Sequence, residues 1–402
     1  MYADPATPYG RSHTTDGGVP MADITVIGGG IAGLSAAITA AERGAGVALL
    51  EAHEETGGRA RSTDGPYRAN LGPHVLYKDG PLWAWLDERG LLPACARPPF
   101  SGMRVRWEGE LRRTPPLAAV PTVLRLRGRD APVDRSFREW VADHSDEKTA
   151  AMLSAAAGVY TFHHDPGSLS AAFVWPRTVR TLLSPPPTVR YPIGGWSALV
   201  ATMESRAREL GVHVRTGARV TELPDGPVVV ATELHEAARL LGDPSVTWTS
   251  GRTLCLDLGL RTRRGDPFIV FDLDEAGWVE RFTAPDPTLA PDGEELFQAQ
   301  MPMRPDEDAD AAAARLERLL DASVEGWRDR VTWRRRQVMD GRSGALDLPG
   351  TTWRDRPAVD RGDGVFLAGD MVAAPGLLSE VAWASGVEAA TLATAAVPAG
   401  VG

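Results

Sequence analysis

Residues 23–51 read DITVIGGGIAGLSAAITAAERGAGVALLE. A short β-branched run leads straight into a glycine-rich turn, and apolar residues then recur at helical spacing as far as Gly44. A second apolar run, of the type found in buried strands, follows and ends at Glu51. The stretch therefore predicts a complete β-α-β unit.

The chemistry of a bound dinucleotide explains each glycine of the turn. Gly28 permits the tight bend, Gly30 lets the backbone approach a pyrophosphate, and Gly33 lets the helix pack closely on the strand. The helix N-terminus favours the negative charge of the phosphates. Glu51, about 20 residues beyond the turn, is placed to accept hydrogen bonds from a ribose and to repel the 2′-phosphate of NADP. NAD and FAD both remain open at this point.

The residues after Glu51 separate these two cofactors. Residues 51–62 read EAHEETGGRARS, which resembles the extension found in the FAD-dependent amine oxidase, protoporphyrinogen oxidase and phytoene desaturase group. The resemblance implies FAD, with the glycine pair and Arg59 near its phosphates and flavin side. No His or Cys lies in a recognisable covalent-flavin motif, so we expect FAD to be bound non-covalently.

Three later segments resemble the same group. They are NLGPHVLY at 70–77, RYPIGGW at 190–196, and GVFLAGD at 364–370 with the helical segment that follows it. The resemblance implies that the first segment lies beside the flavin ring. It also implies that Val220 contacts adenine through its backbone and that Asp370 lies at the ribitol or pyrophosphate. The expected cofactor-binding residues are Gly28, Gly30, Ile31, Ala32, Gly33, Glu51, Ala52, Gly58, Arg59, Gly72, Pro73, His74, Val220, Ala231, Gly369, Asp370 and Val381.

The predicted fold class is α/β, a Rossmann-type FAD-binding domain with a three-layer, mostly parallel sheet and an inserted α+β substrate domain. Short strands are expected at 212–214 and 219–221, and an amphipathic helix at 306–323. The expected organisation is a disordered tail (1–20), three parts of the FAD domain (21–95, 190–254 and 341–402), and two parts of the substrate domain (96–189 and 255–340).

Composition and charge narrow the class of protein. The 402 residues include 43% hydrophobic and 24% charged residues, as in a folded globular chain, and no apolar run of about 18 residues predicts a transmembrane helix. The net charge of −10 argues against a nucleic-acid partner. Cys95 and Cys255 match no metal or redox spacing, so we expect no metal site and a reducing, cytoplasmic environment. For residues 115–126 we favour an ordinary buried helix over contact with a membrane surface.

The resemblance implies hydride transfer to flavin N5, a reaction that needs no protein nucleophile. His74 is the one candidate catalytic residue, although a histidine before an apolar run is more often a packed residue. Amine oxidases of the group carry an aromatic residue at the position of Leu378, so desaturase-type oxidation of a lipophilic or conjugated small molecule, as in secondary or isoprenoid metabolism, is favoured over amine oxidation. The resemblance also leaves open a non-redox flavin isomerase or mutase, and a prenyl-protein binding module like the Rab GDP-dissociation inhibitors.

Overall fold

A computed structural model describes residues 22–72, 75–99, 101–183 and 187–397. The expected tail, residues 1–20, lies outside the described residues. No helix in the described part of the chain is long and apolar enough to cross a membrane.

The residues of the opening motif form the centre of a five-stranded parallel sheet of order β15-β9-β1-β2-β8. The strands are β1 (Ile24–Ile27), β2 (Val47–Leu50), β8 (His213–Arg215), β9 (Val228–Val230) and β15 (Val365–Leu367). Valines 228, 229 and 230 are almost fully buried, as expected of a parallel strand that is covered on both faces. Strands from both ends and the middle of the chain therefore meet in one sheet.

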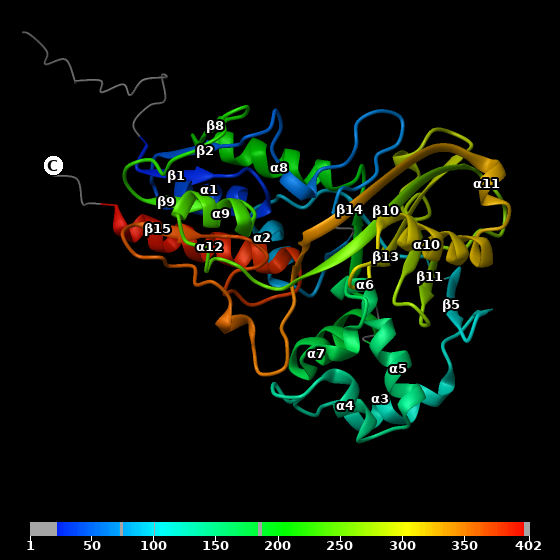
Figure 1. The fold of residues 1–402 in the computed structure, drawn as a ribbon. Coiled ribbons are helices and arrows are strands. Elements are labelled where there is room, and N and C mark those ends of the chain that lie inside the picture. The colour runs from blue at the N-terminus through cyan, green and yellow to red at the C-terminus, as the bar shows by residue number, and fades with distance from the viewer. Residues whose placement is uncertain (1–21, 73–74, 100, 184–186, 398–402) are drawn as a thin grey trace, which may run out of the picture.

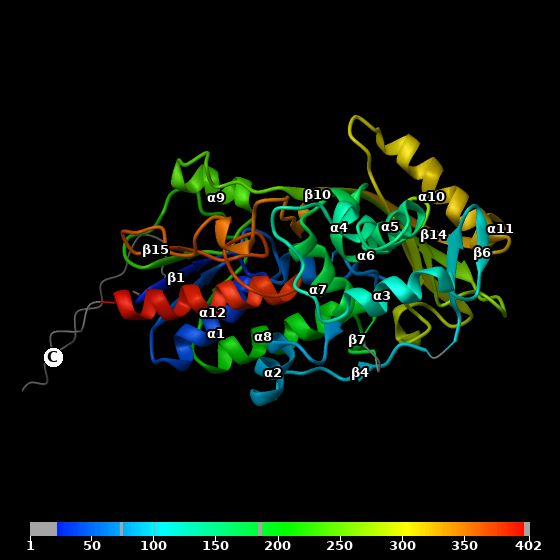
Figure 2. The same cartoon turned by 90° about the horizontal axis from the view of Figure 1, so that it is seen from below.

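Three helices lie together along this sheet: α1 (Ile31–Glu42), α8 (Trp196–Glu209) and α12 (Ser379–Ala396), as Figure 2 shows. A Cβ atom added to Gly386 of α12 would lie 2.3 Å from the carbonyl oxygen of Ala32. Only a glycine permits the two helices to approach so closely. This contact fixes the C-terminal helix against the first helix of the nucleotide-binding unit.

A second, seven-stranded sheet has the order β14-β10-β13-β12-β11-β5-β6 and lies to the right in Figure 1. Its strands are β5 (Met103–Trp107), β6 (Glu110–Arg112), β10 (Ser250–Arg261), β11 (Ile269–Asp272), β12 (Trp278–Arg281), β13 (Glu294–Pro302) and β14 (Val331–Ala345). The neighbouring strands β5 and β6 pair antiparallel and form a hairpin. Its turn residues Glu108 and Gly109 both have positive φ, the signature of a tight hairpin.

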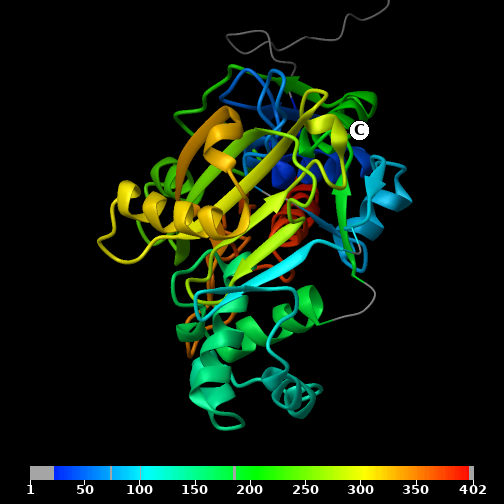
Figure 3. The ribbon, with the colours of Figure 1, turned by 90° about the vertical axis from the view of Figure 1, so that its right-hand side faces the viewer.

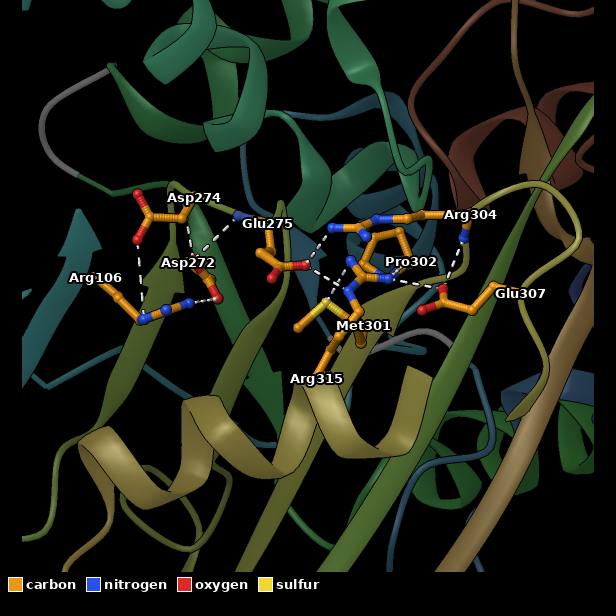
Figure 4. Close-up of polar contacts among 9 residues, drawn as sticks. All are labelled: Arg106, Asp272, Asp274, Glu275, Met301, Pro302, Arg304, Glu307 and Arg315. Carbon is orange, nitrogen blue, oxygen red and sulfur yellow. Dashed lines mark hydrogen bonds and ion pairs between the residues drawn. The ribbon is translucent and has the colours of Figure 1, made fainter. Parts of the chain in front are cut away.

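The helix α10 (Ala309–Ser323) covers one face of the seven-stranded sheet (Figure 3) and buries Leu316, Leu319 and Leu320, as expected. Its N-cap is Asp308, whose carboxylate accepts hydrogen bonds from two backbone N–H groups of the first turn. Figure 4 shows the buried Arg315 of this helix between Glu275 and Glu307. The buried guanidinium is neutralised by two carboxylates, so this network serves to hold the helix on the sheet.

A helical layer lies below the seven-stranded sheet in Figure 1. It contains α3 (Val120–Leu126), α4 (Phe137–Ala142), α5 (Glu147–Ala156), α6 (Gly158–Thr161) and α7 (Ala171–Leu182). The expectation of an ordinary buried helix at 115–126 is only half right. Leu126 is buried, but Leu117 and Leu124 are 79% and 64% exposed.

The remaining elements complete the molecule. A small sheet of order β3-β7-β4 joins β3 (Leu76–Tyr77), β7 (Val189–Pro192) and β4 (Cys95–Ala96), and the other helices are α2 (Pro81–Glu88), α9 (Leu234–Leu241) and α11 (Trp327–Arg330).

The strand expected at 219–221 is absent from this described segment, so that prediction is wrong. The backbone N–H groups of Gly217 and Ala218 donate instead to His53 and Glu51, so the chain runs past the end of β2 without pairing in the sheet. The division into domains stays a prediction.

Candidate cofactor site

The glycine turn between β1 and α1 is too tightly packed to admit side chains at two of its positions. A Cβ atom on Gly33 would lie 1.8 Å from the carbonyl oxygen of Gly28, and one on Gly28 would lie 2.5 Å from that of Ala231. Gly28 also has φ +103°, which disfavours any other residue. These two glycines are therefore required by the protein's own packing.

Three other glycines leave room for a Cβ atom at ordinary contact distance. A Cβ atom on Gly30 would find its nearest neighbour at 3.9 Å, one on Gly369 at 3.8 Å, and one on Gly58 would lie 3.6 Å from the Cα of Gly30. Gly30 begins α1 without a side-chain cap, and the first turn holds no acidic residue. The N–H groups of a first helical turn have no partners within the helix. The arrangement fits the pyrophosphate of a dinucleotide.

Glu51 ends β2 and turns its carboxylate back toward the glycine turn. Its side chain is buried and accepts hydrogen bonds from the backbone N–H of Gly29 at 2.7 Å and of His53 at 2.9 Å. These bonds fix the orientation of the carboxylate before any ligand arrives. A carboxylate has about four acceptor positions, so it can still accept a bond from a ribose hydroxyl.

Arg59 and Asp370 join the two ends of the chain. The guanidinium of Arg59 donates to both carboxylate oxygens of Asp370, at 2.7 and 2.9 Å, although the residues are 311 positions apart. Burial acts to lower the pKa of Arg59, but Asp370 and then Glu233 hold that pKa above its ordinary value. Asp370 follows β15, and the backbone N–H of the adjacent Gly369 donates to the Ser385 hydroxyl of α12.

The structure thus brings several expected cofactor-binding residues to one edge of the parallel sheet. Ile31 and Ala32 lie in the first turn of α1, and Ala231 follows β9 and donates to Ile27 at 2.8 Å. Val220 packs against the hydrophobic core that surrounds the parallel sheet, and Val381 is buried in α12. Two more expected residues lie near this edge. Ala52 directly follows Glu51, and a Cβ atom added to Gly72 would lie 3.1 Å from Arg59.

Pro73 and the candidate catalytic residue His74 lie outside the described residues. The contacts of all the expected residues with a cofactor stay a prediction.

Arg177, which no motif indicated, meets Leu378 and Val381 at the start of α12. Leu378, just before the helix, has φ 53° and ψ −113°, which is strained for a residue other than glycine. It lines a small cavity together with Arg177 of α7 and Val381. Arg177 lies in the segment VWPRT, which carries no recognisable pattern. Only the packing of α7 against α12 reveals it.

The face of the seven-stranded sheet opposite α10 carries buried polar side chains. Asp257 accepts a hydrogen bond from the side chain of Gln298 at 2.9 Å, and Gln298 also donates to the carbonyl oxygen of Asn70 at 3.0 Å. On the neighbouring strand the buried Glu280 accepts a hydrogen bond from the Tyr191 hydroxyl. This face therefore meets the segment that the sequence placed beside the flavin ring.

Glu280 is expected to make the stability of the protein depend on pH. Burial raises the pKa of Glu280 to about 7, although the hydrogen bond from Tyr191 opposes this shift. In the unfolded chain this carboxyl ionises at its lower, ordinary pKa. Between that pKa and about 7, ionisation stabilises the unfolded chain but not the folded protein. The free energy of unfolding therefore falls as the pH rises toward 7. At about 1.36 kcal/mol per pKa unit the loss is up to about 3 kcal/mol.

The check is urea unfolding of the wild type and Glu280→Gln between about pH 5 and about pH 8. Glu280→Gln should lose less stability over this interval than the wild type. Tyr191→Phe, which removes the donor to the carboxylate, should lose more. Identical pH profiles for all three proteins would contradict the assignment.

Comparison with known proteins agrees with this geometry. Residues 26–89 match the family model of an NAD(P)-binding Rossmann-like domain. The Carotenoid 3,4-desaturase of Haloarcula japonica is 55% identical over 53 residues, which are 13% of this chain and 10% of that protein. The match thus spans a tenth of the relative's length.

Two solved structures share the fold over nearly the whole chain. An oxidoreductase from Methanosarcina mazei has a TM-score of 0.75 at 17% identity, covering 92% of this chain and 99% of that one. The cyclohexylamine oxidase of Brevibacterium oxydans has a TM-score of 0.68 at 15% identity, covering 94% and 99%. The predicted fold class, an α/β protein with a Rossmann-type nucleotide-binding domain, is confirmed.

Proposed function

We propose that the chain is an FAD-dependent oxidoreductase that removes a hydride from an apolar or conjugated small molecule, as a desaturase or dehydrogenase does. The observation that carries the proposal is the open group of Gly30, Gly58 and Gly369 at the uncapped start of α1, closed on one side by the Arg59–Asp370 pair. The Rossmann-like match supports a dinucleotide cofactor, and the short desaturase match supports this reaction class.

Each part of the site has a task in this proposal. Bound FAD supplies the electron sink for the hydride. The first turn of α1 holds the pyrophosphate, and Glu51 orients the adenosine ribose. The start of α12 favours negative charge near the pyrimidine edge of the flavin. Leu378 and Val381 keep water away from the reacting face.

Amine oxidation is less favoured. Leu378 stands where the amine oxidases of the group carry an aromatic residue, and it offers an ammonium group no π face. The side chain of Arg177 lines the same cavity, and its positive charge repels an ammonium group. Likeness to the cyclohexylamine oxidase, at 15% identity, concerns the fold alone.

Anaerobic mixing tests the proposal. The FAD-loaded protein is mixed without oxygen with a panel of conjugated lipophilic compounds and a matched panel of amines, while the visible flavin absorbance is followed. We expect one of the lipophilic compounds to bleach the flavin, and readmitted oxygen or an added acceptor to restore it. Bleaching by amines alone would contradict the proposal.

The same experiment distinguishes the proposed oxidoreductase from an isomerase and from a binding module. An isomerase or mutase would form product while the flavin ends oxidised with no acceptor present. A prenyl-protein binding module would take up no FAD at all, in the manner of the Rab GDP-dissociation inhibitors. A cytoplasmic location stays a prediction.

A further inference from the structure

One segment of the chain is both basic and apolar. Residues 112–129 read RRTPPLAAVPTVLRLRGR, with five arginines and no acidic residue, although the whole chain has a net charge of −10. The segment follows the β5–β6 hairpin and forms a short helical turn (Leu117–Ala119) that continues into α3. It therefore places positive charge and apolar side chains together on an otherwise acidic protein.

This helical stretch has two apolar faces. Its inner face, which includes Ala119 and Leu126, packs into the core of the helical layer. Its outer face consists of Leu117, Val120 and Leu124, which recur at helical spacing and are 79%, 47% and 64% exposed. A helix that is apolar all round is normally buried on every side. No other described residue covers this outer face, so it is a candidate contact surface.

The arginines beside the outer face carry charge that the protein does not neutralise. Arg112 forms an ion pair with Glu110. The other four are exposed and form no ion pair with a carboxylate of the described residues: Arg113, Arg125, Arg127 and Arg129. Arg125 and Arg129 donate instead to His144, to its carbonyl oxygen at 2.7 Å and to its ring nitrogen at 3.1 Å. The outer face is thus flanked by positive charge that is free to meet an anion.

The helix α3 lies at the lower end of the helical layer in Figure 1, away from the five-stranded sheet, and Figure 3 also places the helical layer at one end of the molecule. A flat surface can approach this end without meeting either sheet first. The position suits contact with an extended surface.

We propose that the outer face of α3 docks the protein on an anionic phospholipid surface. Leu117, Val120 and Leu124 enter the boundary between the headgroups and the acyl chains, and the flanking arginines meet the lipid phosphates. Charge complementarity selects both the partner and the orientation, because an anionic surface attracts this segment and repels the acidic remainder of the chain. Docking goes beyond the proposed function: it brings the protein to the phase in which an apolar substrate dissolves.

The test is sedimentation of the full chain, loaded with FAD, with two kinds of vesicles. One kind is phosphatidylcholine alone, and the other is phosphatidylcholine and phosphatidylglycerol in equal parts. We expect the wild type to bind the anionic vesicles about 10-fold or more tightly than the neutral ones. Added salt should weaken this binding, because salt screens exposed charges.

Two variants test the two components of the surface. Leu117→Ser combined with Leu124→Ser removes exposed apolar groups, and Arg113→Gln combined with Arg127→Gln removes two charges that have no ion-pair partner among the described residues. Each double variant should bind anionic vesicles about 10-fold or more weakly than the wild type. Neither changes a buried side chain, so both should melt at the wild-type temperature. If one of them fails to fold, the other still tests the proposal.

Matched controls carry the same kinds of change elsewhere on the surface. Val338→Ser alters a valine of β14 that is 39% exposed. Arg263→Gln combined with Arg264→Gln removes two exposed arginines between β10 and β11. Both controls should bind anionic vesicles as the wild type does.

Three results would overturn the proposal: no binding of the wild type to anionic vesicles, equal binding to both kinds of vesicles, or wild-type binding in both double variants. Self-association of the wild type that Leu117→Ser with Leu124→Ser abolishes, without any vesicle binding, would also overturn it and assign the face to a second copy of the chain. Vesicle binding requires no turnover and can be measured without FAD. Its failure would therefore leave the proposed flavin function standing.

Discussion

Gly33→Ala is expected to destroy the nucleotide-binding turn, whereas Gly30→Ala, three residues earlier, is expected to leave the fold intact and weaken FAD binding. The added methyl group of Gly33→Ala would lie 1.8 Å from the Gly28 carbonyl oxygen. The strand or the helix must move to relieve that overlap, at a cost of about 1–3 kcal/mol or more.

Gly30→Ala is the matched variant because its methyl group meets no protein atom closer than 3.9 Å. The fold should tolerate it. The methyl group would instead occupy the space of the pyrophosphate and displace it from the first turn of α1. Losing a hydrogen bond to a charged group costs about 1.5–3 kcal/mol, so FAD affinity should fall about 10- to 100-fold.

Urea unfolding of the FAD-free proteins and FAD titration separate the two effects. Gly33→Ala should unfold at a lower urea concentration and bind no measurable FAD. Gly30→Ala should unfold like the wild type and bind FAD weakly. Wild-type affinity in Gly30→Ala would show that the pyrophosphate does not lie against this glycine.

Glu380→Ala is expected to cause the second large effect, a loss of stability of about 3–5 kcal/mol. The carboxylate of Glu380 lies in the first turn of α12 with only 3% of its side chain exposed, and it forms two hydrogen bonds of 2.7 Å with Arg180 of α7. It also accepts the backbone N–H of Leu377. Removing it leaves a partly buried guanidinium without its main partner and loosens the start of α12.

Asp79→Ala supplies the control, since Asp79 contacts the same guanidinium but is 40% exposed. Exposed ion pairs contribute about 0–1 kcal/mol, so this variant should unfold nearly as the wild type does. The two variants are compared by their urea midpoints. Equal losses of stability in Glu380→Ala and Asp79→Ala would mean that the burial of Glu380 does not determine how much this residue stabilises the fold.

The sequence predicted the nucleotide-binding unit well because its signals are local. The periodicity of residues 23–51 and the glycine spacing determine β1, α1 and β2 within a short stretch of chain. The amphipathic helix at 306–323 was predicted for the same reason, apart from its first residues. The strand at 219–221 was predicted wrongly, because apolar alternation does not reveal whether a neighbouring strand is within reach.

Local sequence patterns of this kind could not predict the long-range contacts of the site. The motifs indicated Arg59 and Asp370 separately, but their direct pairing depends on the whole fold. Arg177 and Glu380 lie outside the expected residues, because each gains its role from the packing of α7 against α12. The exposure of Leu117 and Leu124 was missed since helical periodicity does not say which face is covered.

The central claim is that the open glycines at the start of α1 hold FAD. The most direct measurement is the visible spectrum of the purified protein after incubation with FAD and removal of the free cofactor, followed by denaturation and analysis of the released nucleotide. We expect flavin absorbance bands from about one FAD per chain, and denaturation should release the FAD intact because binding is non-covalent. A protein that shows no flavin absorbance after this treatment would contradict it.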